Sequence, residues 1–258
     1  MKKLLREKKN LSTVYAHIVD NQLSMITPER FMTIDRLAEE IYDEGIEGDI
    51  VECGCWRGGM SIYMAYAFPD RHLWAYDSFE GFEETTDSTY PYADEKHTPL
   101  MEKVYQDHLS ARAPEEPSHR PPNGWVPLAI PYEKVVQSFL DIGLSEAQGI
   151  TITKGFVNKT LKPETCKIEK IALLRIDVDA YSATRDVLEN LFDKVVPGGY
   201  VIFDDTGIDS TTAAIWDFDK ETANGIIERM RTHQGKLLSP ATKHTEWGLS
   251  GNYIKKDK

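Results

Sequence analysis

The sequence predicts an α/β fold built on a doubly wound, mostly parallel sheet, and three observations support this. Strand-like apolar runs alternate with helical patterns along the 258 residues, as expected for parallel crossovers. Two of these runs, "LLRID" and "GGYVIFDD", are continuously apolar like buried parallel strands, yet end in acids. A glycine-rich turn follows the first predicted strand. Ligands bind at such strand ends, so the fold also predicts where a site lies.

Residues 1–47 are expected to form a helical N-terminal cap on a single domain that spans 1–258. Within this cap, Thr27 is a suitable N-cap and Pro28 suits the first helical position. The residues that follow recur at helical spacing and form one apolar face: Phe31, Ile34, Leu37, Ala38 and Ile41.

Strands and helices then alternate to the end of the chain. Strands are expected near 49–53, 72–77, 149–153, 171–177, 198–205 and 245–256. Helices are expected from about residue 58 and over 133–143, 182–194 and 211–231.

The segment 83–126 interrupts this alternation, because it is polar, rich in proline and too long for an ordinary connection. It follows the carboxyl end of the second strand, where substrates bind in such folds. We expect a substrate lid, with a passive surface insertion as the alternative.

Composition limits the partners. A net charge of −12 argues against a nucleic-acid surface or an anionic membrane. No 18-residue apolar span and no signal-peptide core occur. Three cysteines are too few for a disulfide framework, which indicates a reducing cytoplasm. A homo-oligomer is expected, of a size that the sequence leaves open.

The stretch "GDIVECGCWRGGMS", residues 48–61, predicts a strand, a tight turn and a helix N-terminus with free N–H groups. Trp56 stands where dinucleotide-binding turns have the glycine that admits a pyrophosphate, which argues against NAD or FAD. Asp77 lies 23 residues after Gly54, a suitable distance for binding a ribose diol. A ligand with a ribose but no pyrophosphate, S-adenosylmethionine, fits this pattern. A simple tight turn is the alternative.

Asp177, Asp204 and Asp205 follow two consecutive strands and should converge at the same sheet edge. Clustered carboxylates repel unless a cation neutralises them, and hard oxygen ligands suit Mg²⁺, Mn²⁺ or Ca²⁺. We therefore predict a metal site at these three acids. Asp179 is interpreted as an N-cap or a solvated loop acid.

Three stretches, "GDIVECGCWRGG", "LWAYDSFEGF" and "LLRIDVDAYSATRDVLENLFDKVVPGGYVIFDDTG", together resemble the macrocin O-methyltransferase family. The resemblance extends from about residue 25 to 230. It implies a seven-stranded class I methyltransferase (Rossmann-like) fold, S-adenosylmethionine, Mg²⁺ held by the three acids, and a sugar hydroxyl of a glycosylated natural product as acceptor. The segment 153–161 resembles one near the adenine, although an ordinary strand-exit turn is the alternative. The candidate cofactor-binding residues are Glu52, Cys53, Gly54, Gly58, Gly59, Ser61, Asp77, Ser78, Gly155 and Phe156.

An aliphatic hydroxyl must be made more acidic before it can attack a sulfonium methyl. A divalent cation lowers its pKa and an adjacent carboxylate can take the proton, a role assigned here to Asp177. Related catechol methyltransferases have a lysine where this sequence has Ala180, which favours sugars over phenols. The alternatives are a phenol or other vicinal diol as acceptor, and a non-catalytic binding protein of the same fold.

Overall fold

The protein is described by a computed structural model over residues 5–81, 129–206, 209–232, 234–237 and 251–257. The strands are β1 (Asp49–Cys53), β2 (Leu73–Asp77), β3 (Ile150–Lys154), β4 (Ile171–Ile176), β5 (Val195–Phe203) and β6 (Asn252–Lys255). The helices are α1 (Leu11–Asp20), α2 (Pro28–Asp43), α3 (Gly59–Ala67), α5 (Tyr132–Asp141), α6 (Val157–Thr160), α7 (Tyr181–Leu191), α8 (Asp209–Thr222) and α9 (Ile226–Arg229), with 3₁₀ turns at Glu146–Gln148 and Phe192–Lys194.

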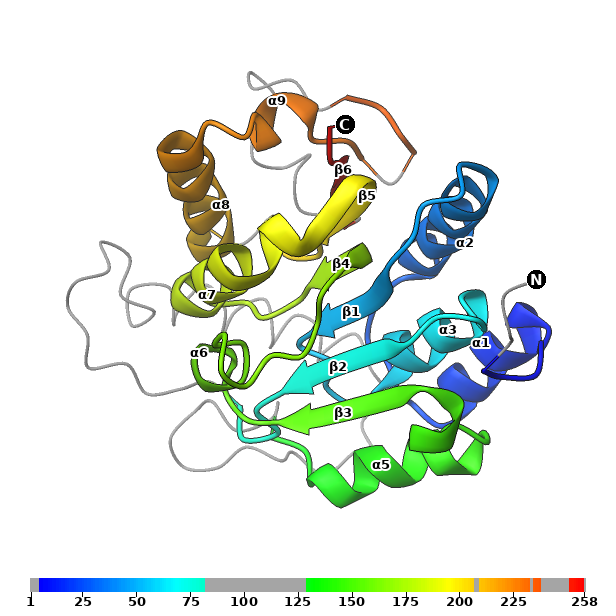
Figure 1. Ribbon diagram of the computed structural model, residues 1–258. Helices are drawn as coiled ribbons and strands as arrows, with labels where there is room; N and C mark the ends of the chain where they lie inside the picture. Colours follow the sequence, from blue (N-terminus) through cyan, green and yellow to red (C-terminus); the bar gives the residue numbers. More distant parts are fainter. Residues whose placement is uncertain (1–4, 82–128, 207–208, 233, 238–250, 258) are drawn as a thin grey trace.

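The strands form one sheet in the order β3-β2-β1-β4-β5-β6 (Figure 1). Every pairing is parallel except that of β5 with β6. The predicted doubly wound fold is therefore confirmed, with six strands rather than seven in the described part of the chain. The expected closing strand begins in residues outside that part, and only Asn252–Lys255 of it is seen.

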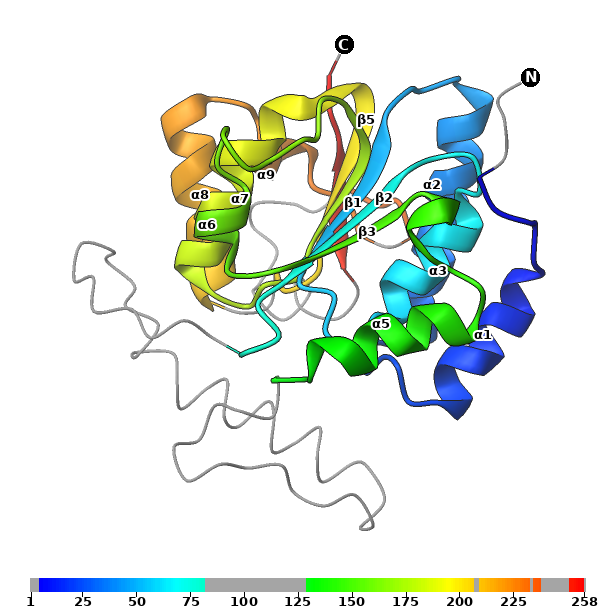
Figure 2. The same cartoon turned by 60° about the horizontal axis from the view of Figure 1, so that its bottom comes forward.

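Helices cover both faces of the sheet, and a separate apolar core lies on each side. Figure 2 shows the sheet nearly edge-on, with α1, α2, α3 and α5 on one side and α6, α7, α8 and α9 on the other. Ile34, Leu37 and Ile62 belong to the first core, whereas Val187, Leu188 and Ile215 belong to the second. Both faces are buried, which explains why the central strands read as continuous apolar runs.

The predicted start and inner face of α2 are confirmed. Thr27 is the N-cap residue and Pro28 is the first helical residue. All five residues of the predicted apolar face are buried: Phe31, Ile34, Leu37, Ala38 and Ile41. The helix therefore packs as its 3.6-residue periodicity requires.

The single helix expected over 211–231 is interrupted in the structure. It is divided into α8 and α9 by a turn in which Ala223 and Gly225 have positive φ angles of 52° and 64°. The Asp219 carboxylate accepts the backbone N–H groups of Ile226 and Ile227, at 2.7 and 3.0 Å. Asp219 thus satisfies amides at the start of α9, a role that helical periodicity does not reveal.

The segment 83–126, expected to be a lid, lies outside the described residues. Within the described residues, no helix is long and apolar enough to span a membrane.

Candidate active site

The candidate residues gather where the parallel strands end. Strand β1 lies between β2 and β4, so the order of the strands reverses direction at the β1/β4 boundary. The two strand ends touch at Gly54, where an added Cβ would lie 1.6 Å from the carbonyl oxygen of Asp177. Only glycine permits this approach, and its φ of 88° also favours glycine. The glycine turn and the acids that follow β4 are therefore direct neighbours.

The glycine-rich turn is closed by its own hydrogen bonds. The Gly58 N–H donates to the Cys55 carbonyl at 2.7 Å, and the Gly59 N–H donates to the Leu23 carbonyl at 3.0 Å. The expectation of free N–H groups at this turn is therefore wrong for these two: Gly58 donates within the turn, and Gly59 donates to a segment far earlier in the sequence. Such a long-range contact is not visible in local sequence patterns.

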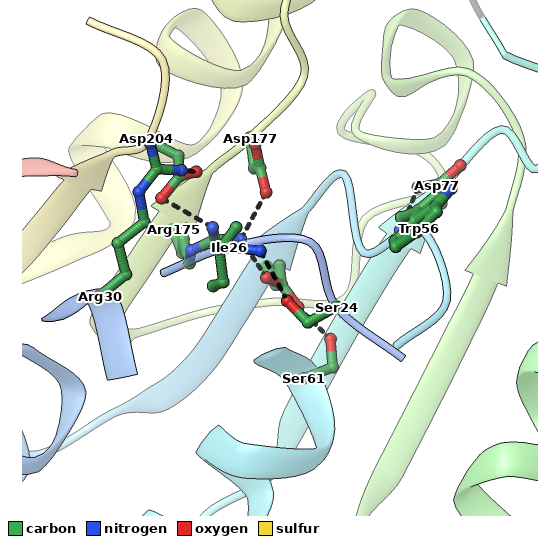
Figure 3. A network of polar contacts seen from close by, with 10 residues as sticks. Ser24, Ile26, Arg30, Trp56, Ser61, Asp77, Arg175, Asp177 and Asp204 are labelled. Carbon is green, nitrogen blue, oxygen red and sulfur yellow. Dashed lines mark hydrogen bonds and ion pairs between the residues drawn. The ribbon is translucent and has the colours of Figure 1, made fainter. Parts of the chain in front are cut away.

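Asp77 ends β2 and organises the same turn. One of its carboxylate oxygens accepts the Trp56 N–H at 2.8 Å (Figure 3). The other accepts the Phe79 N–H at 2.7 Å. Burial raises the pKa of Asp77, and these two amide donors oppose the shift. Trp56 has a φ of 47°, so the bond to Asp77 holds a residue in an unusual conformation.

Three further candidates lie beside Asp77. The Gly155 N–H donates to the Asp77 carbonyl oxygen at 2.9 Å, which joins the ends of β2 and β3. Phe156 follows as the N-cap residue of α6. The Ser78 hydroxyl donates to the Gly81 carbonyl at 2.7 Å. The structure thus brings the residues predicted for the ribose and the adenine to one side of the turn.

Glu52, Cys53 and Ser61 lie beneath the turn, in the interior. Each is 0% exposed. The Ser61 hydroxyl and the Arg175 guanidinium both contact the Glu52 carboxylate. Burial raises the pKa of Glu52 to about 7, with Arg175 and Ser61 opposing the shift. In this structure these residues support the turn from below.

Asp177, Asp179 and Asp205 form an acid cluster on the other side of the turn. Each offers a carboxylate oxygen, and these oxygens lie within 4.8 Å of one another. Burial and the neighbouring carboxylates raise the pKa of Asp179 to about 7 and that of Asp205 well above its usual range. Like charges this close disfavour ionisation.

The interpretation of Asp179 as an N-cap or a solvated acid is wrong. The N-cap residue of α7 is Ala180, and Asp179 is a partly buried member of the acid cluster. Its φ of 58° turns the chain sharply after β4. The sequence signal for this was the spacing "DVD". Two acids separated by one residue can point toward the same site where the chain turns between strand and helix.

Asp204 is placed differently from the other acids. It is 1% exposed and lies between two arginines: Arg175 Nη2 is 2.7 Å from its Oδ1, and Arg30 Nη1 contacts its Oδ2 (Figure 3). The structure therefore brings Asp177 and Asp205 together and holds Asp204 in ion pairs. Both arginines escaped sequence reasoning, although Arg175, alone within the apolar run "LLRI", was a detectable signal.

The acid cluster suits a hard divalent cation. Its donors are all carboxylate oxygens, which Mg²⁺ prefers. Oδ2 of Asp205 is buried and has no hydrogen-bond partner among the described residues. A cation would satisfy this oxygen and relieve the repulsion between the carboxylates.

Known O-methyltransferases resemble this chain in sequence. The sequence profile of the macrocin-O-methyltransferase (TylF) family matches residues 18–233. A tetracenomycin rhamnosyl 4'-O-methyltransferase of Streptomyces olivaceus is 30% identical over 234 residues, which cover 85% of this chain and 80% of that protein. The mycinamicin III 3''-O-methyltransferase of Micromonospora griseorubida is 30% identical over 200 residues, which cover 76% and 69%.

A solved structure extends the similarity to three dimensions. The O-methyltransferase NovP superposes with a TM-score of 0.67 at 25% identity, and the match covers 91% of this chain and 82% of NovP. The fold is thus that of an O-methyltransferase.

Proposed function

This chain belongs to the macrocin O-methyltransferase family and is an S-adenosylmethionine-dependent O-methyltransferase, and we propose that it methylates a sugar hydroxyl of a glycosylated natural product. Two relatives methylate, by their names, a rhamnosyl group and a mycinamicin. The observation that carries the proposal is the acid cluster at the β4 and β5 ends, in direct contact with the turn that begins at Gly54.

The cofactor is proposed to lie against the turn after β1, with its ribose at Asp77. The Asp77 carboxylate oxygens each accept one backbone N–H and retain lone pairs for ribose hydroxyls. Gly155 and Phe156 are proposed to lie near the adenine, and Ser78 near the ribose. Glu52, Cys53 and Ser61 are buried, so their proposed part is to fix Gly54, Gly58 and Gly59 where the methionine moiety binds.

The metal is proposed to be Mg²⁺, held by Asp177 and Asp205. Asp204, the third ligand implied by the resemblance, remains a candidate, although both of its oxygens contact arginines here. Asp179 completes the acid cluster in its place. When bound, a divalent cation supplies Lewis acidity that lowers the pKa of the acceptor hydroxyl.

Two carboxylates are candidates for the proton acceptor. Asp177 is the proposed base, and its Oδ2 accepts an N–H from Arg175 at 2.7 Å, which fixes its orientation. Asp179 is a second candidate, because its carboxylate lies in the same acid cluster. The chain's remaining contribution is alignment of the acceptor oxygen with the methyl and sulfur.

Methyl transfer to a panel of acceptors tests the proposal. Purified protein, labelled S-adenosylmethionine and Mg²⁺ are incubated with deoxysugar glycosides, with the matching aglycones and with catechols. Transfer to the glycosides alone is expected. Transfer to catechols alone would establish instead the alternative of a phenol or other vicinal diol as acceptor.

We also propose that the protein works in a reducing cytoplasm, on a small molecule and as a homo-oligomer. The three cysteines Cys53, Cys55 and Cys166 are free, which supports a reducing cytoplasm. The net charge of −12 supports a small-molecule partner over nucleic acid or a membrane. A homo-oligomer is still expected, and sedimentation would measure its size.

A further inference from the structure

Arg175 is a charged residue in the middle of the sheet. It belongs to β4, it pairs in register with Glu52 of β1 on one side and Ile202 of β5 on the other, and its side chain is 2% exposed. Burying a guanidinium is costly unless it is paired with opposite charge. Its position therefore calls for an explanation in terms of its partners.

Its partners come from both halves of the site. Arg175 Nη1 contacts Glu52 beneath the glycine turn and lies 2.7 Å from Oδ2 of Asp177 in the acid cluster. Nη2 lies 2.7 Å from Oδ1 of Asp204. Figure 3 shows the guanidinium between Asp177 and Asp204. One planar group thus touches residues at the carboxyl ends of three adjacent strands, β1, β4 and β5.

Two further side chains extend this group of contacting side chains, one at Glu52 and one at Asp204. The Ser61 hydroxyl, from α3, donates to Glu52, and Arg30, from α2, pairs with Asp204. Three carboxylates thus face two guanidiniums. Asp177 belongs both to this group and to the acid cluster, so the two are directly connected.

We propose that Arg175 is the positioning residue of this active site and couples cofactor binding to metal binding, by holding Glu52 and Asp177 on one guanidinium nitrogen. This inference rests on the proposed function. A cation that binds Asp177 competes with Arg175 for its carboxylate. This alters the contact of Arg175 with Glu52, and therefore the position of the turn above Glu52 that receives the cofactor. By linkage, the cofactor has the same effect on metal affinity.

Calorimetry with S-adenosylhomocysteine tests the coupling, in EDTA and in saturating Mg²⁺. This product lacks the sulfonium charge, so direct repulsion between the two ligands is small. In the wild type we expect Mg²⁺ to tighten binding at least fivefold, within the usual range of coupling between sites. In Arg175→Met, which keeps the length of the side chain without its charge, the ratio should fall below twofold.

Two further variants make the test specific. Arg185→Met removes another largely buried arginine, paired with Glu189 and Glu221 on the far side of the sheet, and should keep the wild-type ratio. Arg175→Lys keeps the charge but replaces a fork by one ammonium, so its ratio should be at most half the wild-type value. It carries the test if Arg175→Met does not fold.

The outcomes separate this inference from the proposed function. If the wild type binds neither S-adenosylhomocysteine nor Mg²⁺, the proposed function is wrong. If it binds both and the ratio is near one, or if the ratio survives in Arg175→Met, the coupling role of Arg175 is wrong.

Discussion

Buried carboxylates dominate this site at the scale of single residues. Glu52 and Asp204 are buried and Asp205 is partly buried, and burial raises the pKa of each. Glu52 and Asp204 contact guanidiniums, whereas Asp205 belongs to the acid cluster. Removing an acid that contacts a guanidinium should therefore lower stability, whereas removing an acid of the cluster should raise stability and weaken metal binding.

Asp204→Asn and Asp205→Asn are expected to change the stability of the metal-free protein in opposite directions. Asp204→Asn removes the charge partner of Arg30 and one of the three carboxylates that contact Arg175, and should destabilise the metal-free protein by about 1–3 kcal/mol. Asp205→Asn relieves repulsion with Asp177 and Asp179, so it should raise the melting temperature while weakening Mg²⁺ binding. Denaturant unfolding and metal titration measure the two effects, and equal destabilisation by both substitutions would contradict the assignment.

Asp77→Ala should weaken S-adenosylhomocysteine binding by about 1.5–3 kcal/mol, because the proposed ribose hydrogen bonds to a carboxylate are lost. The amides of Trp56 and Phe79 also lose their acceptor, so a lower melting temperature is expected. Asp141→Ala, at the exposed end of α5, is the control. Calorimetry showing unchanged affinity would remove Asp77 from the cofactor site.

The metal-free protein should become less stable as the pH rises from about 5 to 8. The folded-state pKa of Glu52, about 7, lies above its unfolded value, so the folded state binds more protons between the two pKa values. The free energy of unfolding therefore falls as the pH rises through the folded-state pKa of Glu52, by at most about 3 kcal/mol. Glu52→Gln should show a smaller fall in melting temperature over this range. A fall as steep as the wild type's would exclude Glu52 as a source.

At the scale of elements, the site depends on how closely β1 and β4 approach at their ends. The backbone of Asp177 crosses Gly54 with no space for a side chain, while the Asp177 N–H donates to the Cys53 carbonyl at 2.9 Å. The turn proposed for the cofactor and the acids proposed for the metal are therefore fixed to each other by backbone contacts.

Gly54→Ala should abolish cofactor binding and destabilise the fold by more than about 3 kcal/mol, since its Cβ would overlap the Asp177 carbonyl. Gly45→Ala is the matched control: its φ of 64° is also positive, but nothing lies within 4 Å of an added Cβ. The control should lose only about 1 kcal/mol from backbone strain. Unfolding experiments that give equal losses would show that φ strain, and not the close contact, decides the effect.

At the scale of the whole molecule, helices cover both faces of the sheet with apolar side chains. Charged side chains therefore gather at the carboxyl ends of the strands. Within the described part, Asp177, Asp179 and Asp205 come from the ends of β4 and β5. A ligand bound only by the folded state stabilises it by mass action.

Mg²⁺ should therefore raise the melting temperature of the wild type, and EDTA should abolish methyl transfer reversibly. The stabilisation should disappear in Asp205→Asn, which lacks one charged ligand, and should persist in Arg185→Met. Full activity of the metal-free protein would show that the acid cluster has a structural role only.

Local patterns in the sequence determined much of the fold. Periodicity determined α2 and its buried face, since helical spacing places Ile34, Leu37 and Ile41 on one side. The apolar runs determined β4 and β5, and the glycines determined the turn after β1. The parallel order followed from alternation, so the convergence of Asp177 and Asp205 was predictable before any coordinates.

Only the tertiary structure decided the partners of these groups. Arg30 lies 174 residues before Asp204, and Arg175 lies 123 residues after Glu52, so no local pattern links them. The same holds for the Leu23 carbonyl that occupies the Gly59 amide. A backbone torsion placed Asp179 in the acid cluster, and torsions at non-glycine residues are set by surrounding packing. Residue types and spacing thus specified which side chains gather at the strand ends, while long-range contacts decided which of the acids contact arginines and which of them join the acid cluster.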